Sequence, residues 1–525
     1  MKFIAHSLFL TLFLSCNLYS QEPVDKGLNM ITRDALQAQL GFLASDWTEG
    51  RETGERGAFL AADYIASMLK LYGVKPAGDI VNAYNPASRS YERKRTYFQS
   101  FALQQNLPYS SQSLEIVNKN QGKVHKLSFE PGTDFNIAPS YPGLEIESEV
   151  VFVGYGYRNE DTGYDDFKNT DIEGKIILRL TGVPEGLSVY ENDRYAAYRI
   201  SRDKDRIATE LGAAAILEAD PRDNGMRWTT PKPFMNMSPS ESGRHSSRKR
   251  YSIPDSEVSD APVKAYISKR TANAVLSRTG KTLENLLRGK RTESLNTGAI
   301  VKIKAASQSE LVHVRNVIGM IEGKKRDEII VIGAHYDHVG MVDGYINNGA
   351  DDNGSGTVGV MTMARAIQAC GPKPEKTIIF ALWTGEEKGL LGSRYFVDNP
   401  TVPLEHIVMN LNFDMISRYV ADDKPDDVTV TYTESYPYFQ EITERYIEDY
   451  NIELKPDYVS SPNPPGGSDH RSFVAKGIPI LRFKPGHREE YHTPADEYET
   501  IDWDIMEKII KISFLDIWDL ANNEW

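Results

Sequence analysis

The chain has 525 residues, of which 40% are hydrophobic and 26% charged, and a formal net charge of −14. A chain of this length exceeds one ordinary hydrophobic core, so two or three domains are expected. The negative charge argues against nucleic acid or an anionic membrane as the main partner, because both repel an acidic protein.

Residues 1–20 are predicted to be a secretory signal peptide. Lys2 gives a short positive start, an apolar stretch follows, and a small residue precedes the polar sequence that begins at Gln21. The apolar run is too short for a membrane anchor, and no later segment is suited to span a bilayer. The protein is therefore expected to be exported, either periplasmic or secreted. The alternative is lipidation at Cys16, which would make the protein an outer-surface lipoprotein.

Once the signal peptide is removed, Cys370 is the one remaining cysteine, so no internal disulfide is expected.

Residues 21–142 are predicted to begin a larger host domain. The apolar residues of "AFLAADYIASMLKLYGV" recur at helical spacing, and Gly73 ends this helix. The polar sequence "WTEGRETGERG" before it is expected to be a loop, and the Tyr-rich sequence after it is expected to stay irregular. In residues 143–303, strand patterns such as "GKIILRL" alternate with helical ones, which predicts a small inserted α+β domain.

In residues 304–525, strands and helices alternate, which predicts a doubly wound mixed α/β sheet with helices on both faces. The expected strands are "EIIVIGAH", "KTIIFALW", "HIVMNLNFDM", "DVTVTYT" and "IPILRF". The last helix carries an apolar stripe on one face, which indicates packing against the core.

Acidic and imidazole side chains follow the ends of these strands. The crevice beyond the carboxyl ends of the strands is where open α/β sheets bind ligands, so we expect these side chains to meet there. They are His335 and Asp337 after the first strand, Asp351 and Asp352 in the glycine-rich turn that follows, Glu386 and Glu387 after "IIFALW", Asp414 after "IVMNLNF", and His492 after "IPILRF".

A cluster of this kind repels itself unless cations bind it. Imidazole and carboxylate together suit zinc, and one carboxylate can bridge two zinc ions. Two metals about 3.5–4 Å apart can polarise a carbonyl and generate hydroxide from water at neutral pH. The adjacent acids Glu386 and Glu387 can then divide the work, because one binds metal while the other moves the proton of the water. A nucleophilic serine is disfavoured, since no G-x-S-x-G sequence stands between a predicted strand and helix.

Five segments, "GAHYDHVG", "GADDNGSG", "TGEEKGLLGS", "NFDM" and "EYHTPAD", together resemble the co-catalytic di-zinc aminopeptidase family. That family includes the secreted bacterial aminopeptidases and glutamate carboxypeptidase. The resemblance covers residues 30–140 and 304–525 and implies the zinc aminopeptidase-like fold for the host domain. Residues 143–303 resemble a protease-associated domain in composition and position.

The resemblance implies a metal-binding role for five residues. His335 and Asp414 would bind one zinc ion, and Glu387 and His492 would bind the other. Asp352 would bridge both ions, and a cis peptide bond would follow it. Asp351 is nearly as attractive from the residues alone, but the register of the motif favours Asp352.

The resemblance also implies catalytic roles. Glu386 would be the general base toward the bridging water and then the general acid toward the leaving amine. Tyr491 would stabilise the oxyanion, and Asp337 would accept the ring N–H of His335 and fix its tautomer. His338 is expected to make a structural hydrogen bond rather than bind metal.

We therefore expect an exported metalloprotease of the exopeptidase type, an aminopeptidase with two zinc ions that removes N-terminal residues from peptide substrates. The inserted domain is expected to restrict peptide access. Three alternatives stay open. A carboxypeptidase of the same family would use Arg418 or Arg482 for a terminal carboxylate, a glutaminyl cyclase-like enzyme would use one zinc ion, and a receptor-like binding protein would have no activity.

Overall fold

The computed structural model describes residues 23–525 except 107–110, 121–122, 138–142, 185, 188–195, 221–248, 255–261, 288–293, 307, 343 and 487. The chain divides into two compact units, the first made of residues up to 102 together with 313–525, and the second of residues 103–312. The predicted signal peptide and Cys16 lie outside the described residues.

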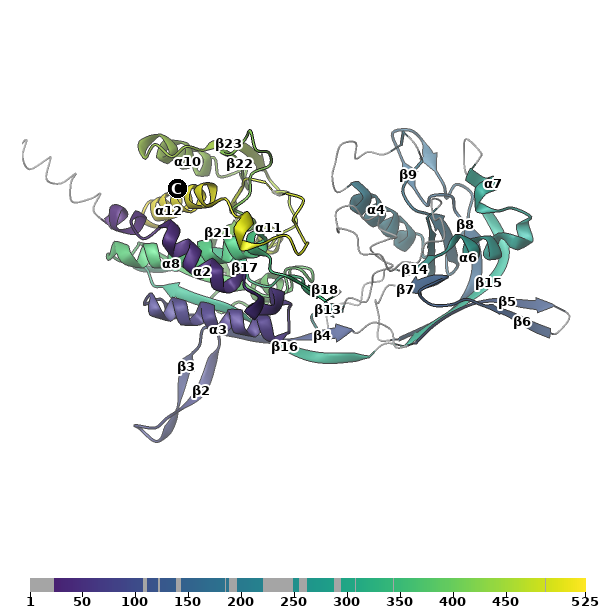
Figure 1. The fold of residues 1–525 in the computed structure, drawn as a ribbon, viewed down its shortest axis with the longest axis horizontal. Helices are drawn as coiled ribbons and strands as arrows, with labels where there is room; N and C mark the ends of the chain where they lie inside the picture. Colours follow the sequence, from purple (N-terminus) through teal and green to yellow (C-terminus); the bar gives the residue numbers. More distant parts are fainter. Residues whose placement is uncertain are drawn as a thin grey trace, which may run out of the picture. The chain divides into compact units, whose positions relative to one another are not determined.

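The first unit is built on a mixed sheet whose central strands are parallel (Figure 1). The strand order is β4-β16-β20-β17-β21-β24-β22-β23, and β1 pairs with β16. Strands β20, β17, β21 and β24 run parallel, whereas β16 and β22 run antiparallel to β20 and β24. The bounds are β1 Lys75–Pro76, β4 Phe98–Asn106, β16 Ser309–Ile321, β17 Lys325–His335, β20 Lys376–Trp383, β21 Ile407–Phe413, β22 Asp427–Thr433, β23 Lys455–Ser461 and β24 Ile480–Lys484.

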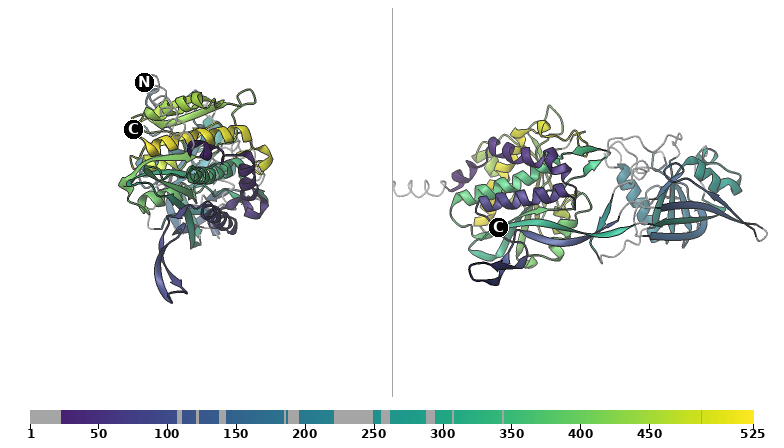
Figure 2. Two further views of the ribbon diagram at one scale, coloured as in Figure 1. Left: turned by 90° about the vertical axis from the view of Figure 1, so that its left-hand side faces the viewer. Right: turned by 60° about the horizontal axis from the view of Figure 1, so that its bottom comes forward.

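Helices cover both faces of this sheet, as the alternating pattern predicted. One face packs against α2 (Arg33–Leu43), α3 (Arg56–Leu71), α8 (Gly356–Cys370), α10 (Tyr438–Asp449) and α12 (Trp503–Asn522). The other face packs against α9 (Leu391–Asp398) and α11 (His470–Val474). Helix α8 lies beside both α2 and α3 (Figure 2). Because both faces are covered, every residue of β20 is buried, which explains the apolar run that follows Lys376 and Thr377.

The register of the central strands sets the position of the polar residues that follow them. His335 of β17 pairs with Trp383 of β20, and Ala334 pairs with Phe413 of β21. Phe413 in turn pairs with Phe483 of β24. These parallel strands therefore end at the same edge of the sheet, and the loops that leave them meet there.

The second unit has its own sheet, with the order β6-β5-β15-β8-β11-β12-β14-β7. Strands β8, β11, β12 and β14 run parallel, and α4 (Ala196–Glu210), α6 (Lys269–Leu276) and α7 (Leu283–Leu287) accompany them. The strands are β5 Ser111–Asn120, β6 Lys123–Ser128, β7 Phe135–Ile137, β8 Gly143–Phe152, β11 Ile176–Leu180, β12 Ala215–Ala219, β14 Val263–Ile267 and β15 Leu295–Ala306. The expected insert, residues 143–303, lies inside this unit, whose limits are wider on both sides because β5 pairs with β15.

One expectation about local structure needs correction. The Tyr-rich sequence after α3 is not irregular, because it forms the hairpin β2 (Ile80–Asn85) and β3 (Ser90–Arg95) and then β4, β5 and β6. The expectation failed because this hairpin is exposed on both faces and so shows no alternation of apolar and polar residues.

Cys370 is buried. No helix among the described residues is long and apolar enough to cross a membrane.

Candidate metal centre

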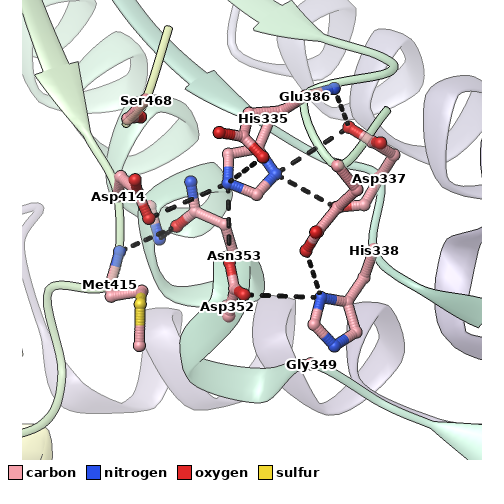
Figure 3. A network of polar contacts seen from close by, with 12 residues as sticks. His335, Asp337, His338, Gly349, Asp352, Asn353, Glu386, Asp414, Met415 and Ser468 are labelled. Atoms are coloured by element: carbon pink, nitrogen blue, oxygen red, sulfur yellow. Dashed lines mark hydrogen bonds and ion pairs between the residues drawn. The ribbon is translucent and has the colours of Figure 1, made fainter. Parts of the chain in front are cut away.

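The predicted ligand residues converge at the carboxyl edge of the first sheet, where Figure 3 shows His335, Asp352 and Asp414 close together. They form two groups of closely spaced donor atoms, each group lying within 4.8 Å. The first group is His335, Glu386 and Asp414, and the second is His338, Asp352, Glu387 and His492. Two of these side chains are within one group because their strands are neighbours: His335 ends β17, and Asp414 directly follows β21.

In the first group, His335 Nε2 faces three carboxylates. It lies 3.8 Å from Asp414 Oδ1, 4.0 Å from Glu386 Oε2 and 3.5 Å from Asp352 Oδ1. The His335 ring is only 1% exposed, so its other nitrogen must also be satisfied inside the protein. That nitrogen, Nδ1, lies 3.1 Å from the backbone carbonyl oxygen of Asp337.

In the second group, His492 Nε2 lies 2.9 Å from Asp352 Oδ2 and 3.0 Å from Glu387 Oε1. Nδ1 of His338 approaches the same two carboxylates, at 3.7 Å from Asp352 Oδ2 and 3.0 Å from Glu387 Oε1. The second group thus gathers two imidazoles around two carboxylates. His338 belongs to it by distance, although the sequence analysis set it apart from the ligands.

Asp352 stands between the two groups. Its Oδ1 faces His335 and its Oδ2 faces His492, as expected of a carboxylate that bridges two cations. The peptide bond from Asp352 to Asn353 is cis, as the resemblance implied. Asp351 points elsewhere, because its Oδ1 accepts hydrogen bonds from the backbone N–H and the hydroxyl of Ser417, at 3.0 and 2.6 Å.

The position of Asp352 depends on a residue that the sequence analysis did not single out. Asp496 is 2% exposed, and its two carboxylate oxygens accept the backbone N–H groups of Asp351 and Asp352, at 2.9 and 3.0 Å. Asp496 stands four residues after His492, so one loop supplies both a donor of the second group and the support of the bridging position. The "HTPAD" sequence contains this aspartate, but no local pattern distinguishes it from a surface acid.

Arg51 is a second residue that the sequence analysis missed, since the loop that contains it appeared solvated. It is 1% exposed, and its guanidinium donates to the backbone carbonyls of Tyr336, Leu43, Asn348 and Gly349. Burial lowers the pKa of Arg51 to about 10, against the pull of nearby carboxylates. This side chain therefore ties the end of β17 and the segment before Asp352 to the end of α2.

The expected role of Asp337 differs from what the structure shows. Its carboxylate Oδ1 is 3.8 Å from His335 Nδ1, too far for a hydrogen bond. Instead Oδ1 accepts the backbone N–H of Glu386 at 3.2 Å, and Oδ2 accepts the hydroxyl of Thr53 at 2.8 Å. Asp337 thus orients His335 through its backbone carbonyl and supports Glu386 through its side chain.

Electrostatics at the site show an excess of negative charge. Burial opposes the charged form of His492, yet Glu387 and Asp352 raise its pKa to about 10. The pKa of His335 is also raised well above its ordinary value, against burial, with Glu386 the largest contributor among the carboxylates. Burial raises the pKa of Glu386 well above its ordinary value, and repulsion from Glu387 adds to this. The donors therefore favour added positive charge.

A metal ion of the zinc type fits this donor set. The donors are imidazole nitrogens and carboxylate oxygens, which are the ligands that zinc takes in proteins. Adjacent donors in the second group, such as His492 Nε2 with Asp352 Oδ2 or Glu387 Oε1, are 2.9 to 3.0 Å apart. Ligands of one tetrahedral zinc ion, with bonds of about 2.0–2.1 Å, would lie roughly that far apart or slightly farther.

Three further residues named by the sequence analysis surround the donors. The Tyr491 ring stacks on His492, with ring centroids 3.8 Å apart. Arg482 is 8% exposed, and its Nη2 lies 3.5 Å from Asp414 Oδ2. Arg418 donates to the carbonyl of Thr500, and its Nη2 lies 3.2 Å from a carboxylate oxygen of Glu490. Both arginines are thus already engaged within the protein.

The fold and the site define an α/β protein with a zinc-type metal centre at the carboxyl edge of its sheet. Residues 316–515, less than half of the chain, match the model of Peptidase family M28. The matched segment contains all the donor residues of both groups.

Several curated proteins share this segment. Leucine aminopeptidase 2 of Arthroderma otae is 30% identical over 207 residues, which is 38% of each chain. Leupeptin-inactivating enzyme 1 of Streptomyces exfoliatus is 33% identical over 171 residues, which is 31% of this chain and 34% of that one. The chain thus matches well under half the length of these relatives.

Two solved structures share the fold over nearly the full chain. An aminopeptidase from Aneurinibacillus sp. strain AM-1 matches 95% of this chain and 97% of its own, with a TM-score of 0.58 and 19% identity. The zinc aminopeptidase BSAP from Bacillus subtilis matches 94% of this chain and 96% of its own, with a TM-score of 0.52 and 20% identity. At these identities the likeness concerns the fold.

Proposed function

We propose that this protein is a di-zinc aminopeptidase that removes N-terminal residues from peptides. The observation that carries the proposal is the placement of Asp352, whose two oxygens face two different donor groups. His335 and Asp414 would hold one ion, Glu387 and His492 the other, and Asp352 both. Two zinc ions bound there would polarise the scissile carbonyl and lower the pKa of a water molecule.

Glu386 is the residue that would move protons in this reaction. Burial raises its pKa well above that of an ordinary carboxyl, which makes it a stronger proton acceptor than an ordinary carboxylate. Its backbone N–H donates to Asp337, which fixes the start of the loop after β20. Glu386 would take a proton from the attacking water and deliver it to the leaving amine. Tyr491 would donate its hydroxyl to the oxygen that becomes negative.

The engagement of the two arginines supports an aminopeptidase over a carboxypeptidase. A carboxypeptidase needs a cation available to a terminal carboxylate, whereas Arg418 contacts Glu490 and Arg482 contacts Asp414. The names of the similar proteins, leucine aminopeptidase and zinc aminopeptidase, favour the same choice.

The test is a panel of aminoacyl substrates, with free and N-acetylated amino groups, assayed with and without a chelator. Hydrolysis of the free-amine substrates, abolished by the chelator and restored by zinc, is the expected result. Equal or faster hydrolysis of the N-acetylated peptides would contradict aminopeptidase activity and favour the carboxypeptidase. A zinc-to-protein ratio near one, with cyclisation of N-terminal glutamine, would favour the glutaminyl cyclase-like alternative.

Two further proposals concern the rest of the chain. We propose that the protein is exported, with cleavage before Gln21. N-terminal sequencing of the mature protein would test this, and a lipid-modified N-terminus at Cys16 would point to the lipoprotein alternative.

We also propose that residues 143–303 form a protease-associated domain that restricts the length of the peptides that are cleaved. Unchanged kinetics on long and short peptides after its deletion, with the fold kept, would contradict that role.

A further inference from the structure

The imidazole of His338 lies completely buried beside Glu387. Its Nδ1 is 3.0 Å from Glu387 Oε1, within hydrogen-bonding distance, and 3.7 Å from Asp352 Oδ2, beyond it. The rings of His338 and His492 meet edge to face, with centroids 5.5 Å apart. Oε1 of Glu387 thus has His338 at 3.0 Å and His492 at the same distance.

The surroundings of His338 decide which of its nitrogens carries the proton. Among the described residues, Nε2 of His338 is buried without a hydrogen-bond partner. A proton on Nδ1 gives a hydrogen bond to Glu387 and leaves Nε2 as an unpaired acceptor. A proton on Nε2 would leave a buried donor unpaired and would also set the Nδ1 lone pair against a carboxylate oxygen. The first tautomer has one unfavourable feature and the second has two.

The ring is also held firmly in place. The backbone N–H of His338 donates to the carbonyl of Arg51 at 3.1 Å. Gly349, whose φ is +55°, lies so close that an added Cβ would come within 2.5 Å of the His338 ring (Figure 3). The lack of a side chain at Gly349 therefore leaves just enough room for the imidazole. With its backbone anchored and one side of its ring closely packed, His338 can impose an orientation on its partner.

A direct bond from His338 to the metal is the competing role. His492, Asp352 and Glu387 already supply three donors, and a catalytic zinc site keeps its fourth position for water or substrate. His338 as a fourth ligand would close that position. A carboxylate oxygen has two lone pairs, so Glu387 Oε1 can bind a cation and accept a hydrogen bond together.

We propose that His338 is a positioning residue, which donates its Nδ1–H to Glu387 Oε1 and so orients that carboxylate within the second donor group. The inference rests on the proposed function in so far as Glu387 binds zinc. It deepens that proposal, because it assigns a role to a histidine that the ligand set leaves out. Removing such a partner typically weakens metal affinity by about 10- to 100-fold.

The test compares two variants of the full chain, His338→Asn and His338→Leu. The amide nitrogen of asparagine can occupy nearly the place of Nδ1 and donate to Glu387, whereas leucine cannot. Zinc stoichiometry is measured by elemental analysis, and the two dissociation constants by competition with a chromophoric chelator. We expect the leucine variant to weaken one site about 10- to 100-fold, and the asparagine variant to stay within about threefold of the parent.

Wild-type affinity at both sites in the leucine variant would overturn the proposal. Equal loss in both variants, with unchanged circular dichroism and thermal unfolding, would overturn it in favour of direct ligation. If the leucine variant does not fold, nitrogen-15 NMR of histidine-labelled parent protein decides the matter. The chain has ten histidines, and the His338 signals are those missing from the asparagine variant.

The expected NMR result for the zinc-loaded parent is a protonated Nδ1 and an unprotonated Nε2 in His338. A proton on Nε2, or a metal-shifted Nδ1 signal, overturns the proposal. The outcome is separable from the proposed function, because neither readout needs peptide hydrolysis. A protein that binds two zinc ions with the expected affinities but cleaves no peptide would refute the aminopeptidase and leave the role of His338 standing. A protein that binds no zinc would refute both.

Discussion

Asp496 accepts the backbone N–H of Asp352 at 3.0 Å, across 144 residues of sequence. Its other oxygen accepts the N–H of Asp351, so one buried side chain holds both amides of the turn that presents the bridging carboxylate. The loop that carries His492 is thereby fixed to the turn that carries Asp352. The spacing of the two donor groups thus depends on a carboxylate that belongs to neither.

We expect Asp496→Ala to destabilise the protein and to weaken zinc binding. It leaves two buried N–H groups without acceptors, at a cost on the order of 3 kcal/mol. Urea unfolding of the zinc-free protein measures the first effect and chelator competition the second. Asp496→Asn retains one carbonyl acceptor and should lose less than the alanine variant. Equal stability of the alanine variant and the parent would show that these hydrogen bonds contribute nothing.

The substitution Glu386→Gln removes the proposed general base while keeping the size of the side chain. Turnover should fall by roughly 10²- to 10⁴-fold, the usual contribution of a general acid or base. Zinc content should stay at the parent level, since other residues hold the ions in the proposed mechanism. Steady-state kinetics and elemental analysis of the same sample check both points. Loss of one zinc ion would instead identify Glu386 as a ligand. Glu405→Gln, on the surface, is the matched control.

Arg51→Met should strongly destabilise the fold. The guanidinium donates to four backbone carbonyls, which would be left buried without their partner. Each unsatisfied buried acceptor costs about 1–3 kcal/mol, so a total loss above about 3 kcal/mol is expected. Arg56→Met is the control, because the Arg56 side chain is 71% exposed and its ion pair with Glu49 should contribute less than about 1 kcal/mol. A similar change in both variants, measured by chemical unfolding, contradicts the expectation.

Asp516 should make the stability of the protein fall as the pH rises. It is fully buried in α12, and burial raises its pKa well above the ordinary value. The Thr443 hydroxyl lies 2.7 Å from Asp516 Oδ2 and 2.8 Å from the Phe439 carbonyl oxygen, and its single proton can serve only one of these two acceptors at a time. When that proton serves Phe439, a protonated Asp516 carboxyl can donate to Thr443.

The sign follows from proton binding in the two states. Between the unfolded pKa of Asp516, near 4, and its raised folded pKa, the native state holds a proton that the unfolded state has lost. Unfolding free energy therefore decreases through this window, by up to about 1.4 kcal/mol per pH unit. An asparagine side chain at this position would keep a donor toward Thr443 without titrating, so Asp516→Asn should be more stable than the parent by an amount that grows with pH. Asp449→Asn, on the exposed surface of α10, is the control. A stability difference between Asp516→Asn and the parent that does not change with pH contradicts the prediction.

Much of the first unit could be predicted from the sequence. The run "IIFALW" is apolar throughout because β20 is buried on both faces, and the bounds predicted for the whole strand, "KTIIFALW", agree with the structure. His335 and Asp414 stand at or directly after the ends of such strands, and the other donors lie in the loops that follow them, so the strands placed these residues at one edge. Strands β2 to β6 were missed because the exposed hairpin β2–β3 lacks alternation, and β5 finds its partner in β15 far along the chain.

The sequence by itself therefore determined the class of fold, the strand ends and which residue types gather there, because burial and chain direction leave local patterns. Only the tertiary structure decided that Asp337 uses its carbonyl toward His335, that Asp496 supports Asp352, and that His338 contacts Glu387. The contacts of Asp496 and His338 join segments brought together by packing, and a hydrogen bond between residues far apart in the sequence leaves no periodicity in either segment. The same reason hid Arg51, whose partners are backbone carbonyls that every residue possesses.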